Sequence, residues 1–321
     1  MDLQYPTDPA SRTEWILAQR PQRTKIDPNK PYAFFVEEEC SATGEVIPIA
    51  TIFLTNRECP WRCVMCDLWK NTLTRPVEPG AIPRQIAYAL ERLPPARQVK
   101  LYSSGSFFDV QAIPREDYSG IVALVRHFDR TIVECHPSLV GTRCFEFSDL
   151  LSHRLEVAMG LETVDPEVLS LLNKGMTLDL FAKAAASLRS KNIDLRAFIL
   201  VQPPFMKPTE SLHWAQRSIE FAFDCGATAA SLIPTRGGNG AMESLAQAGD
   251  FIPPKLRMLE AAMEYGIRLQ RGRVFSDLWD LRRTGPSCVG CYLARIERLA
   301  AMNLRQQVLG AIECARCEGQ S

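Results

Sequence analysis

The sequence predicts an α/β fold, a partial (βα)6 TIM-type barrel with an N-terminal extension and a small C-terminal cysteine-rich metal-binding segment. Two patterns predict it: apolar, β-branched runs alternate with helical patterns, and polar residues follow the ends of these runs. Runs that are apolar on consecutive residues are typical of parallel strands covered by helices. The 321 residues, 46% of them apolar, suffice for one large core. We expect an extension over 1–45, a barrel over 46–280 and the metal-binding segment over 281–321.

The N-terminal extension is polar and punctuated by prolines. It contains one short helical pattern near Trp15 and one strand pattern, "YAFFVEE" (32–38). It lacks the charged-then-apolar pattern of a signal peptide, and no stretch approaches about eighteen consecutive apolar residues, so we expect a cytoplasmic protein without a membrane partner. The 37 basic and 37 acidic residues cancel, which excludes a global basic field for nonspecific nucleic-acid binding.

Seven apolar runs predict the strands of the barrel. They are "IPIATIFLTN" (47–56), "QVKLYSS" (98–104), "TIVECHP" (131–137), "LEVAMGLE" (155–162), "LRAFILVQ" (195–202), "AASLIPT" (229–235) and, more weakly, "IRLQRGRVF" (267–275). The helical patterns between them cover 83–93, 118–128, 165–174, 177–191 and 211–223. Several of these begin with a residue that can cap a first helical turn. Six or seven such repeats fit an open doubly wound sheet or a partial barrel.

Polar residues at the strand ends favour the barrel. They are Asn56, Ser104 with Gly105, Glu134 with His136, Glu162, Gln202, and Thr235 with Arg236. A barrel brings the carboxyl ends of its strands together over one mouth, where the active sites of such folds lie. Each position alone is explained more simply as a cap on a strand that leaves the core. The six positions together indicate a shared site.

Three cysteines follow the first barrel strand, within "RECPWRCVMCDLWK" (57–70), so Cys59, Cys63 and Cys66 would lie at the mouth. A structural zinc ion takes four protein ligands, and a catalytic zinc ion usually adds histidine or carboxylate. Three close thiolates without an adjacent fourth instead suit a 4Fe-4S cluster with one iron left open for a small molecule. The alternatives are a zinc site completed by a remote cysteine and buried structural thiols.

The segment "CPWRCVMC" (59–66) resembles the CxxxCxxC signature of the radical S-adenosylmethionine (SAM) superfamily, whose partial barrel begins with this loop. Further blocks resemble the group related to the elongator catalytic subunit, and in particular the radical SAM enzyme that forms archaeosine in tRNA. These blocks include "KLYSSGSFFD" (100–109), "VECHP" (133–137) and "EVAMGLETVDPEVLSLLNKGMTLDLF" (156–181). The resemblance covers roughly residues 47–265.

The resemblance implies roles for three sets of residues. The cluster ligands would be Cys59, Cys63 and Cys66. The residues in contact with SAM would be Trp61, Met65, Ser104, Gly105, Ser106 and Glu162. The candidate catalytic residues on the substrate side are Glu134, His136 and Gln202. The superfamily usually has an aromatic residue where this chain has Met65, so Trp61 or Met65 itself would contact adenine. A carboxylate that caps the next helix is the alternative role of Glu162.

The resemblance also implies a reaction, in which a 4Fe-4S cluster cleaves SAM to a 5′-deoxyadenosyl radical that abstracts hydrogen from a substrate. The implied substrate is a modified tRNA nucleoside, cleaved at a carbon–nitrogen bond as in archaeosine formation. The implied partners are a tRNA or tRNA-modifying protein and a flavodoxin- or ferredoxin-type electron donor. The neutral net charge counts against a large tRNA footprint. The alternatives are radical chemistry on a small metabolite or natural-product precursor, and a noncatalytic metal-binding protein that binds a partner.

Two CxxC pairs lie near the C-terminus, Cys288 with Cys291 and Cys314 with Cys317. Such pairs predict a tetrahedral zinc ion, and a second 4Fe-4S cluster is the alternative. Either would hold the helical pattern at 292–307 against the end of the chain.

Two further features carry weaker expectations. The arginines of the last helical pattern and those just before it could meet phosphates, although a solvated helix face is the commoner meaning of such a run. They are Arg282, Arg283, Arg295, Arg298 and Arg305. The stretch "RGGNG" (236–240) matches no phosphate-binding pattern, and we expect a flexible loop at the mouth.

Overall fold

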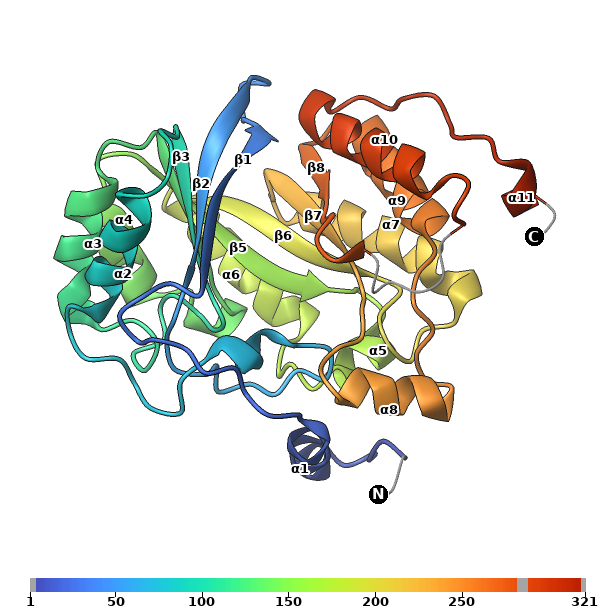
Figure 1. The fold of residues 1–321 in the computed structure, drawn as a ribbon, viewed down its shortest axis with the longest axis horizontal. Helices are drawn as coiled ribbons and strands as arrows, with labels where there is room; N and C mark the ends of the chain where they lie inside the picture. The colour runs from blue at the N-terminus through green and yellow to red at the C-terminus, as the bar shows by residue number, and fades with distance from the viewer. Residues whose placement is uncertain (1–3, 282–287, 319–321) are drawn as a thin grey trace.

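The computed structural model describes residues 4–281 and 288–318 and contains one curled, eight-stranded sheet with strands in sequence order (Figure 1). Its strands are β1 (Ala33–Cys40), β2 (Val46–Leu54), β3 (Gln98–Ser103), β4 (Arg130–Glu134), β5 (Arg154–Glu162), β6 (Asp194–Val201), β7 (Ala229–Pro234) and β8 (Arg273–Ser276). β1 pairs with β2 antiparallel, and every later pair is parallel. The predicted partial TIM-type barrel is confirmed, with β2–β8 as its parallel strands.

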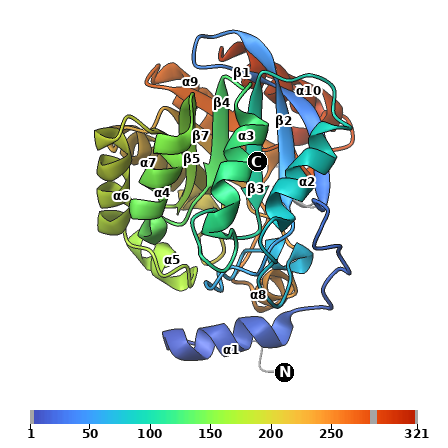
Figure 2. The same cartoon turned by 90° about the vertical axis from the view of Figure 1, so that its left-hand side faces the viewer.

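Helices cover the outer face of the sheet and one end of the barrel (Figures 1 and 2). They are α1 (Pro9–Gln19), α2 (Ala81–Leu90), α3 (Tyr118–Val125), α4 (Thr142–Leu150), α5 (Pro166–Leu171), α6 (Leu178–Ser190), α7 (Pro208–Asp224), α8 (Ala241–Ala248), α9 (Leu256–Arg268), α10 (Tyr292–Arg305) and α11 (Ala315–Glu318). Among them, α2, α3, α4, α6 and α7 cover the outer face in Figure 2, and α1 and α8 lie together at one end. Because α8 follows β7, that end is the carboxyl end of the parallel strands.

Local sequence explains the typical strand–helix repeat. Thr177 caps α6 by accepting a hydrogen bond from the Leu180 N–H (3.2 Å). Apolar residues three and four positions apart then form one buried helix face. These residues are Phe181, Ala184, Ala185 and Leu188. In the parts of the chain that the structure describes, no helix is both long and apolar enough to cross a membrane.

Two segments differ in detail from the expectations. The predicted strand over 267–275 begins too early, because α9 extends to Arg268 and β8 starts only at Arg273. The apolar residues of α9 continue directly into that run, so local composition hides the boundary. The strand expected at 32–38 forms as β1, and its pairing with β2 makes part of the N-terminal extension an edge of the barrel sheet.

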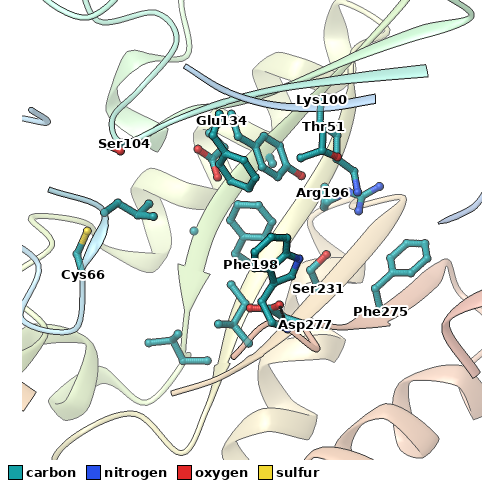
Figure 3. A pocket seen from close by; sticks show the side chains of 18 of the residues that line it. Thr51, Cys66, Lys100, Ser104, Glu134, Arg196, Phe198, Ser231, Phe275 and Asp277 are labelled. Atoms are coloured by element: carbon teal, nitrogen blue, oxygen red, sulfur yellow. Dashed lines mark hydrogen bonds between the residues drawn. The ribbon is translucent and has the colours of Figure 1, made fainter. Parts of the chain in front are cut away.

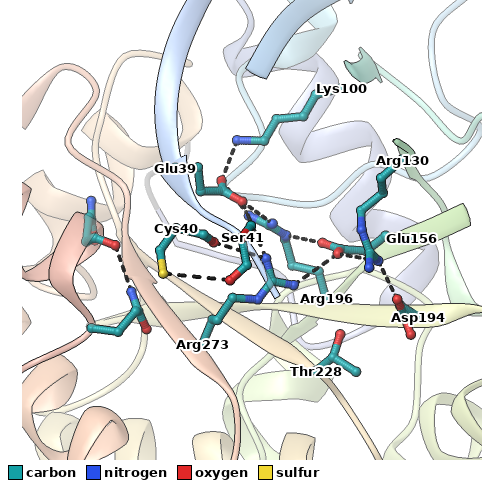
Figure 4. A network of polar contacts seen from close by, with 12 residues as sticks. Glu39, Cys40, Ser41, Lys100, Arg130, Glu156, Asp194, Arg196, Thr228 and Arg273 are labelled. Carbon is teal, nitrogen blue, oxygen red and sulfur yellow. Dashed lines mark hydrogen bonds and ion pairs between the residues drawn. The ribbon is translucent and has the colours of Figure 1, made fainter. Parts of the chain in front are cut away.

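A network of buried ion pairs fills the barrel where β1, β3, β5, β6 and β8 meet (Figure 4). Glu39 bridges Lys100 (2.7 Å) and Arg196 (2.6 Å). Glu156, with a fully buried side chain, binds Arg196 (2.6 Å) and Arg273 (3.2 Å). Each charge is paired, as burial in a low-dielectric interior requires. The partners lie far apart in the sequence, so their pairing had no local signal.

Glu156→Gln will lower the free energy of unfolding by about 3–5 kcal/mol at pH 7, because it leaves buried guanidinium groups without their partner. Burial alone would raise the pKa of Glu156, but Arg196, Arg273 and Arg130 lower it to about 2. A carboxylate with a lowered folded-state pKa stabilises above its unfolded pKa of about 4.3, and this contribution is lost as the pH falls toward 2. The difference in unfolding free energy between variant and wild type, measured in urea, should therefore shrink below about pH 4. An equally large loss of unfolding free energy in the control Glu91→Gln, at an exposed position, would contradict this explanation.

Candidate active site

Loops after β2, β3, β4 and β5 surround one cavity of about 630 Å³ at the carboxyl end of the barrel. Thirteen of the residues singled out in the sequence line it: Cys59, Trp61, Cys63, Met65, Cys66, Ser104, Gly105, Ser106, Glu134, His136, Glu162, Thr235 and Arg236. In Figure 3, Cys66 and Ser104 lie at one end of the cavity, and Lys100, Arg196 and Phe275 lie at the other. The expected convergence therefore occurs at four of the six strand-end positions, whereas Asn56 and Gln202 do not line the cavity.

The cysteine loop, residues 57–67, rests on a small core at the mouth. Val64 is fully buried there among side chains of α1, α5 and α8, and its N–H donates to the Leu172 carbonyl (3.0 Å). Burial raises the pKa of each thiol, Cys59, Cys63 and Cys66, to about 12. Thiolates at this depth need a positive counter-charge, which a metal centre supplies. The donor set of three half-buried sulfurs thus fits a 4Fe-4S cluster with one open iron.

The turn after β3 lies against the cysteine loop. At Gly105, an added Cβ would make an ordinary contact with the Cα of Cys59 at 3.7 Å, so the turn lies next to the cysteine loop. The Ser104 hydroxyl is buried and makes no hydrogen bond of regular geometry among the described residues, although it lies close enough to the Tyr32 hydroxyl to oppose the rise that burial causes in the pKa of that group. A buried hydroxyl without a partner is costly unless a ligand or water supplies one. The turn is therefore suited to a polar ligand bound beside the cysteines.

An ion pair between Glu162 and Lys174 lies beside the cysteines. Glu162 ends β5 with a left-handed backbone (φ 64°), and its carboxylate binds the Lys174 ammonium at 2.7 Å. A Cβ on Gly160 would lie 2.1 Å from the Glu162 Oε1 and 2.6 Å from the Lys174 Nζ, so a side chain there would displace the ends of this pair. Burial would lower the pKa of Lys174, but Glu162 and Cys63 raise it. Lys174 thus adds a permanent positive charge that sequence reasoning missed.

Glu134 and His136 follow β4 and differ in chemistry. Burial raises the pKa of Glu134 to about 8, although the Ser103 N–H (3.1 Å) opposes it. This carboxyl can therefore give or take a proton near neutral pH. Burial lowers the pKa of His136 to about 3; its Nε2–H donates to the Lys174 carbonyl (3.2 Å), and its Nδ1 accepts from the Ser138 N–H (3.2 Å). Both ring nitrogens are engaged, so the geometry favours a positioning role for His136.

Two expected site residues are held by other protein groups. Trp61 stacks on the His136 ring, with centroids 3.7 Å apart, whereas Met65 lines the cavity without such a stack. Gln202 is 2% exposed and does not line the cavity. Its side chain donates to the Met206 carbonyl (3.0 Å) and holds the turn after β6. The structure thus places Gln202 outside the group that surrounds the cavity.

The far half of the cavity has an aromatic wall that sequence reasoning missed. Trp279 lies 4.9 Å from Phe35 between ring centroids, and the series continues through Phe53 and Tyr102 to Phe198 at spacings of 6.0–6.2 Å. These rings come from β1, β2, β3, β6 and the segment after β8. Aromatic residues are common in strands, so their individual positions gave no sign of a shared wall.

The four C-terminal cysteines form a compact group whose sulfur atoms all lie within 4.8 Å of one another. The Sγ atoms of Cys288 and Cys314 are 3.7 Å apart, and those of Cys291 and Cys317 are 3.6 Å apart. A tetrahedral zinc ion with Zn–S bonds of about 2.3 Å requires sulfurs about 3.8 Å apart. The predicted metal-binding group is confirmed as a geometric arrangement, and its spacing fits a single ion.

α10 closes the gap between the two edges of the barrel sheet, in contact with β1 and β8. Asn303 pairs with the backbone of Ser276, accepting from its N–H (2.8 Å) and donating to its carbonyl (2.9 Å). Gln306 does the same with Val274, at 2.7 and 2.9 Å. Two side-chain amides thus occupy the free edge of β8 in place of another strand.

Two of the three arginines of α10 are buried and do not form a solvated face, whereas Arg305 at the end of the helix is exposed. Arg295 and Arg298 are 5% and 6% exposed and bind Glu260 of α9. They also donate to the carbonyls of Ile312 (2.9 Å) and Gly310 (2.7 Å), which holds the chain's end against the helix. Arg282 and Arg283 lie outside the described residues.

Comparisons with known proteins show what the chain is similar to. No family model matches the chain. An uncharacterised protein of Methanocaldococcus jannaschii is 24% identical over 251 residues, 73% of this chain and 69% of that protein. The archaeosine synthase subunit beta of Methanosarcina acetivorans is 24% identical over 250 residues, 73% of this chain and 72% of that protein. Coproporphyrinogen III oxidase of Escherichia coli, described as a radical SAM enzyme, matches 70% of this chain and 53% of its own with a TM-score of 0.45 and 14% identity.

This chain resembles radical SAM enzymes. The predicted similarity to the archaeosine-forming member of the radical SAM superfamily is confirmed by the Methanosarcina relative. The two parts that fit a radical SAM site, the cysteine loop and the Ser104–Gly105 turn, were both visible in the sequence because each is a short local pattern. Lys174 was missed because only the fold brings it to the same cavity.

Proposed function

We propose that this chain is a radical SAM enzyme that binds a 4Fe-4S cluster on Cys59, Cys63 and Cys66 and SAM beside it. When bound, the cluster supplies the electron that cleaves SAM and so generates the radical that abstracts hydrogen. One observation supports this most strongly. Three half-buried thiols, the Ser104–Gly105 turn and the Glu162–Lys174 pair line a single cavity, although they follow three different strands.

In this proposal, the chain's own residues bind and orient SAM. The Ser104 hydroxyl and the backbone of Gly105 and Ser106 would meet the amino-acid end, which lies nearest the cysteine loop. The Lys174 ammonium would bind a carboxylate at that end, and Glu162 would accept hydrogen bonds from the ribose hydroxyls. Charged partners make such hydrogen bonds stronger than neutral ones.

We propose a modified tRNA nucleoside as substrate, with carbon–nitrogen bond cleavage of the archaeosine type. The similarity to an archaeosine synthase subunit beta supports this. The word "subunit" in that relative's name supports a partner protein, and the zero net charge of this chain leaves most of the tRNA contact to that partner. A flavodoxin- or ferredoxin-type protein would supply electrons.

A small metabolite or natural-product precursor is the second candidate substrate, and the cavity's charge favours it. Four Lys and Arg side chains line the cavity, namely Lys100, Lys174, Arg196 and Arg236. Seven carboxylates line it, namely Glu37, Glu38, Glu39, Asp67, Glu134, Glu162 and Asp277. Because burial raises the pKa of Glu134 to about 8, the other six of these groups carry the negative charge at pH 7, and their excess of two over the cations (6 against 4) disfavours entry of a phosphate-rich backbone.

Anaerobic reconstitution tests the proposal. Reduced wild-type protein should convert SAM to 5′-deoxyadenosine, and absence of this product from protein with a full cluster would contradict radical chemistry. Binding to bulk tRNA at varied salt separates the substrates, because contacts with phosphates weaken steeply as salt rises. Lack of salt-sensitive binding, with and without a partner protein, would favour the metabolite.

Lys174→Met will raise the KM for SAM about 10- to 100-fold, because a hydrogen bond between charged groups contributes about 1.5–3 kcal/mol. Iron content should stay unchanged, since Lys174 is not a ligand in this proposal. Lys183→Met, at an exposed position of α6, is the matched control. The double variant Lys174→Met/Glu162→Gln removes the unpaired buried carboxylate and should restore thermal stability without restoring affinity. An unchanged KM in Lys174→Met would contradict this role.

We also propose that the C-terminal cysteines bind zinc, and that residues 281–321 form a metal-stabilised segment packed on the barrel of residues 46–280. The sulfur spacing of 3.6–3.7 Å supports one ion. A 4Fe-4S cluster has a core of several atoms and would hold its four cysteine sulfurs farther apart. Metal analysis of anaerobic protein should find about one zinc and about four irons per chain.

A further inference from the structure

The segment between β7 and α8, residues 236–240, lies directly against the cysteine loop rather than forming the expected flexible loop. Asn239 in this segment is only 2% exposed. Its side-chain amide donates to two backbone carbonyls of the cysteine loop, those of Val64 (2.7 Å) and Cys66 (3.0 Å). Its Oδ1 accepts from the Met242 N–H (2.8 Å) at the start of α8. Every hydrogen-bonding group of this amide is therefore used.

The two carbonyls depend on Asn239. They flank Met65, within the turn in which the Cys66 N–H donates to the Cys63 carbonyl (3.2 Å). Within residues 4–281 and 288–318, no other donor reaches the carbonyl oxygens of Val64 and Cys66. Both oxygens point at one amide nitrogen, so without that donor two partly negative atoms would face each other unsatisfied.

Asn239 is itself held rigidly in place. The Glu243 carboxylate accepts hydrogen bonds from the N–H groups of Gly238 and Gly240, the latter at 2.6 Å. Gly240 has φ 88°, and a Cβ there would lie 1.9 Å from the carbonyl oxygen of Gln19, so the position requires glycine. The Lys70 ammonium, three residues after the cysteine loop, donates to the Gly238 carbonyl. The segment is thus tied to α8, to the chain after α1 and to the loop that it supports.

We propose that Asn239 is a positioning residue that fixes the turn between Cys63 and Cys66, so that all three thiols face one metal centre. This inference rests on the proposed function, because it assumes that the loop binds the cluster. A cluster needs its sulfur ligands at fixed positions, and groups behind the ligands set those positions. Asn239 acts on the ligands through the backbone and does not touch the metal or SAM.

Asn239→Asp is the sharpest test. It keeps the shape and the acceptor for the Met242 N–H, but it replaces the donor with a carboxylate oxygen that faces two carbonyls. We expect iron to leave the reconstituted variant about 10- to 100-fold faster than it leaves wild type in the presence of a chelator. Addition of SAM should also change the shape of the electron paramagnetic resonance signal of the reduced cluster, and this change should differ between the variant and wild type. Asn192→Asp, at an exposed position with φ 56°, is the matched control.

A second measurement uses protein without the cluster. Alkylation of Cys63 and Cys66 by iodoacetamide, followed by mass spectrometry, should be faster in Asn239→Asp, whereas alkylation of the distant Cys225 should be unchanged. Equal iron retention and equal alkylation in variant and wild type would overturn the proposal. If Asn239→Asp does not fold, Asn239→Ala takes its place, and failure of both to fold would assign Asn239 a general folding role and overturn the proposal. A wild-type cluster that does not cleave SAM would contradict the proposed function without altering this comparison.

Discussion

Cys63→Ser will lower 5′-deoxyadenosine formation by more than about 100-fold, because Cys63 is a cluster ligand in our proposal. Changing a group that only supports a metal ligand can already lower activity by up to about 100-fold. Burial raises the pKa of this thiol to about 12, so its thiolate exists there only when a metal centre compensates the charge. A serine alkoxide would be harder still to form, since an alcohol is a weaker acid than a thiol. The variant should therefore also lose the absorption of the cluster and most of its iron.

The matched control for this variant is Cys225→Ser. Cys225 is a free cysteine that ends α7, away from the cavity, so iron content and activity should stay near those of wild type. The zinc content should be the same in both variants, because the C-terminal cysteines are untouched. If Cys63→Ser kept about four irons at the loop and cleaved SAM, Cys63 would not be a ligand and the proposed site would be wrong.

Local patterns made the barrel and half of the site predictable. The cysteine loop and the Ser104–Gly105 turn are contiguous, and each follows an apolar run that the fold turns into a strand. The two CxxC pairs were equally visible. These features are recognised from residue spacing alone, which can be read directly from the sequence.

The residues that sequence analysis missed lack such a local pattern. Lys174 follows a helix, and Asn239 lies in a glycine-rich stretch, so each looked like an ordinary loop residue. What gives them a role is contact with distant segments, 38 positions away for Lys174 and His136 and 175 for the hydrogen bond from Asn239 to Val64. Side-chain identity alone does not encode which distant carbonyl an amide meets, because that depends on how the barrel closes.

The buried charged residues of the strands also show what sequence analysis could not predict. The runs that contain Lys100, Glu156 and Arg196 were predicted as strands correctly, and their charged residues stood out in apolar surroundings. Pairing them requires knowing that β1, β3, β5 and β6 send side chains into one barrel interior. The strand order in the sheet provides this, and the order became known only with the structure.

Loss of the C-terminal metal will lower the stability of the whole protein, and Cys314→Ser is the variant that shows it. A bound ion stabilises the folded state by about 4 kcal/mol when its free concentration exceeds the dissociation constant a thousandfold. Arg295 donates to the Cys291 sulfur (3.2 Å) and binds Glu260 of α9, so the metal group and α10 form one connected unit. We expect a lower unfolding temperature and loss of zinc, with iron unchanged. Cys225→Ser is again the control.

The effect of Cys314→Ser should extend from the metal group to the barrel wall. α10 contributes Ala300, Asn303 and Leu304 to the cavity lining, and its amides occupy the edge of β8. Hydrogen exchange should therefore accelerate at the N–H groups of Val274 and Ser276, which donate to Gln306 and Asn303, while β5 in the centre of the sheet stays protected. If zinc is lost but hydrogen exchange at β8 is not faster, α10 keeps its position without the metal. The buried arginine–glutamate pairs would then be sufficient to keep the barrel closed.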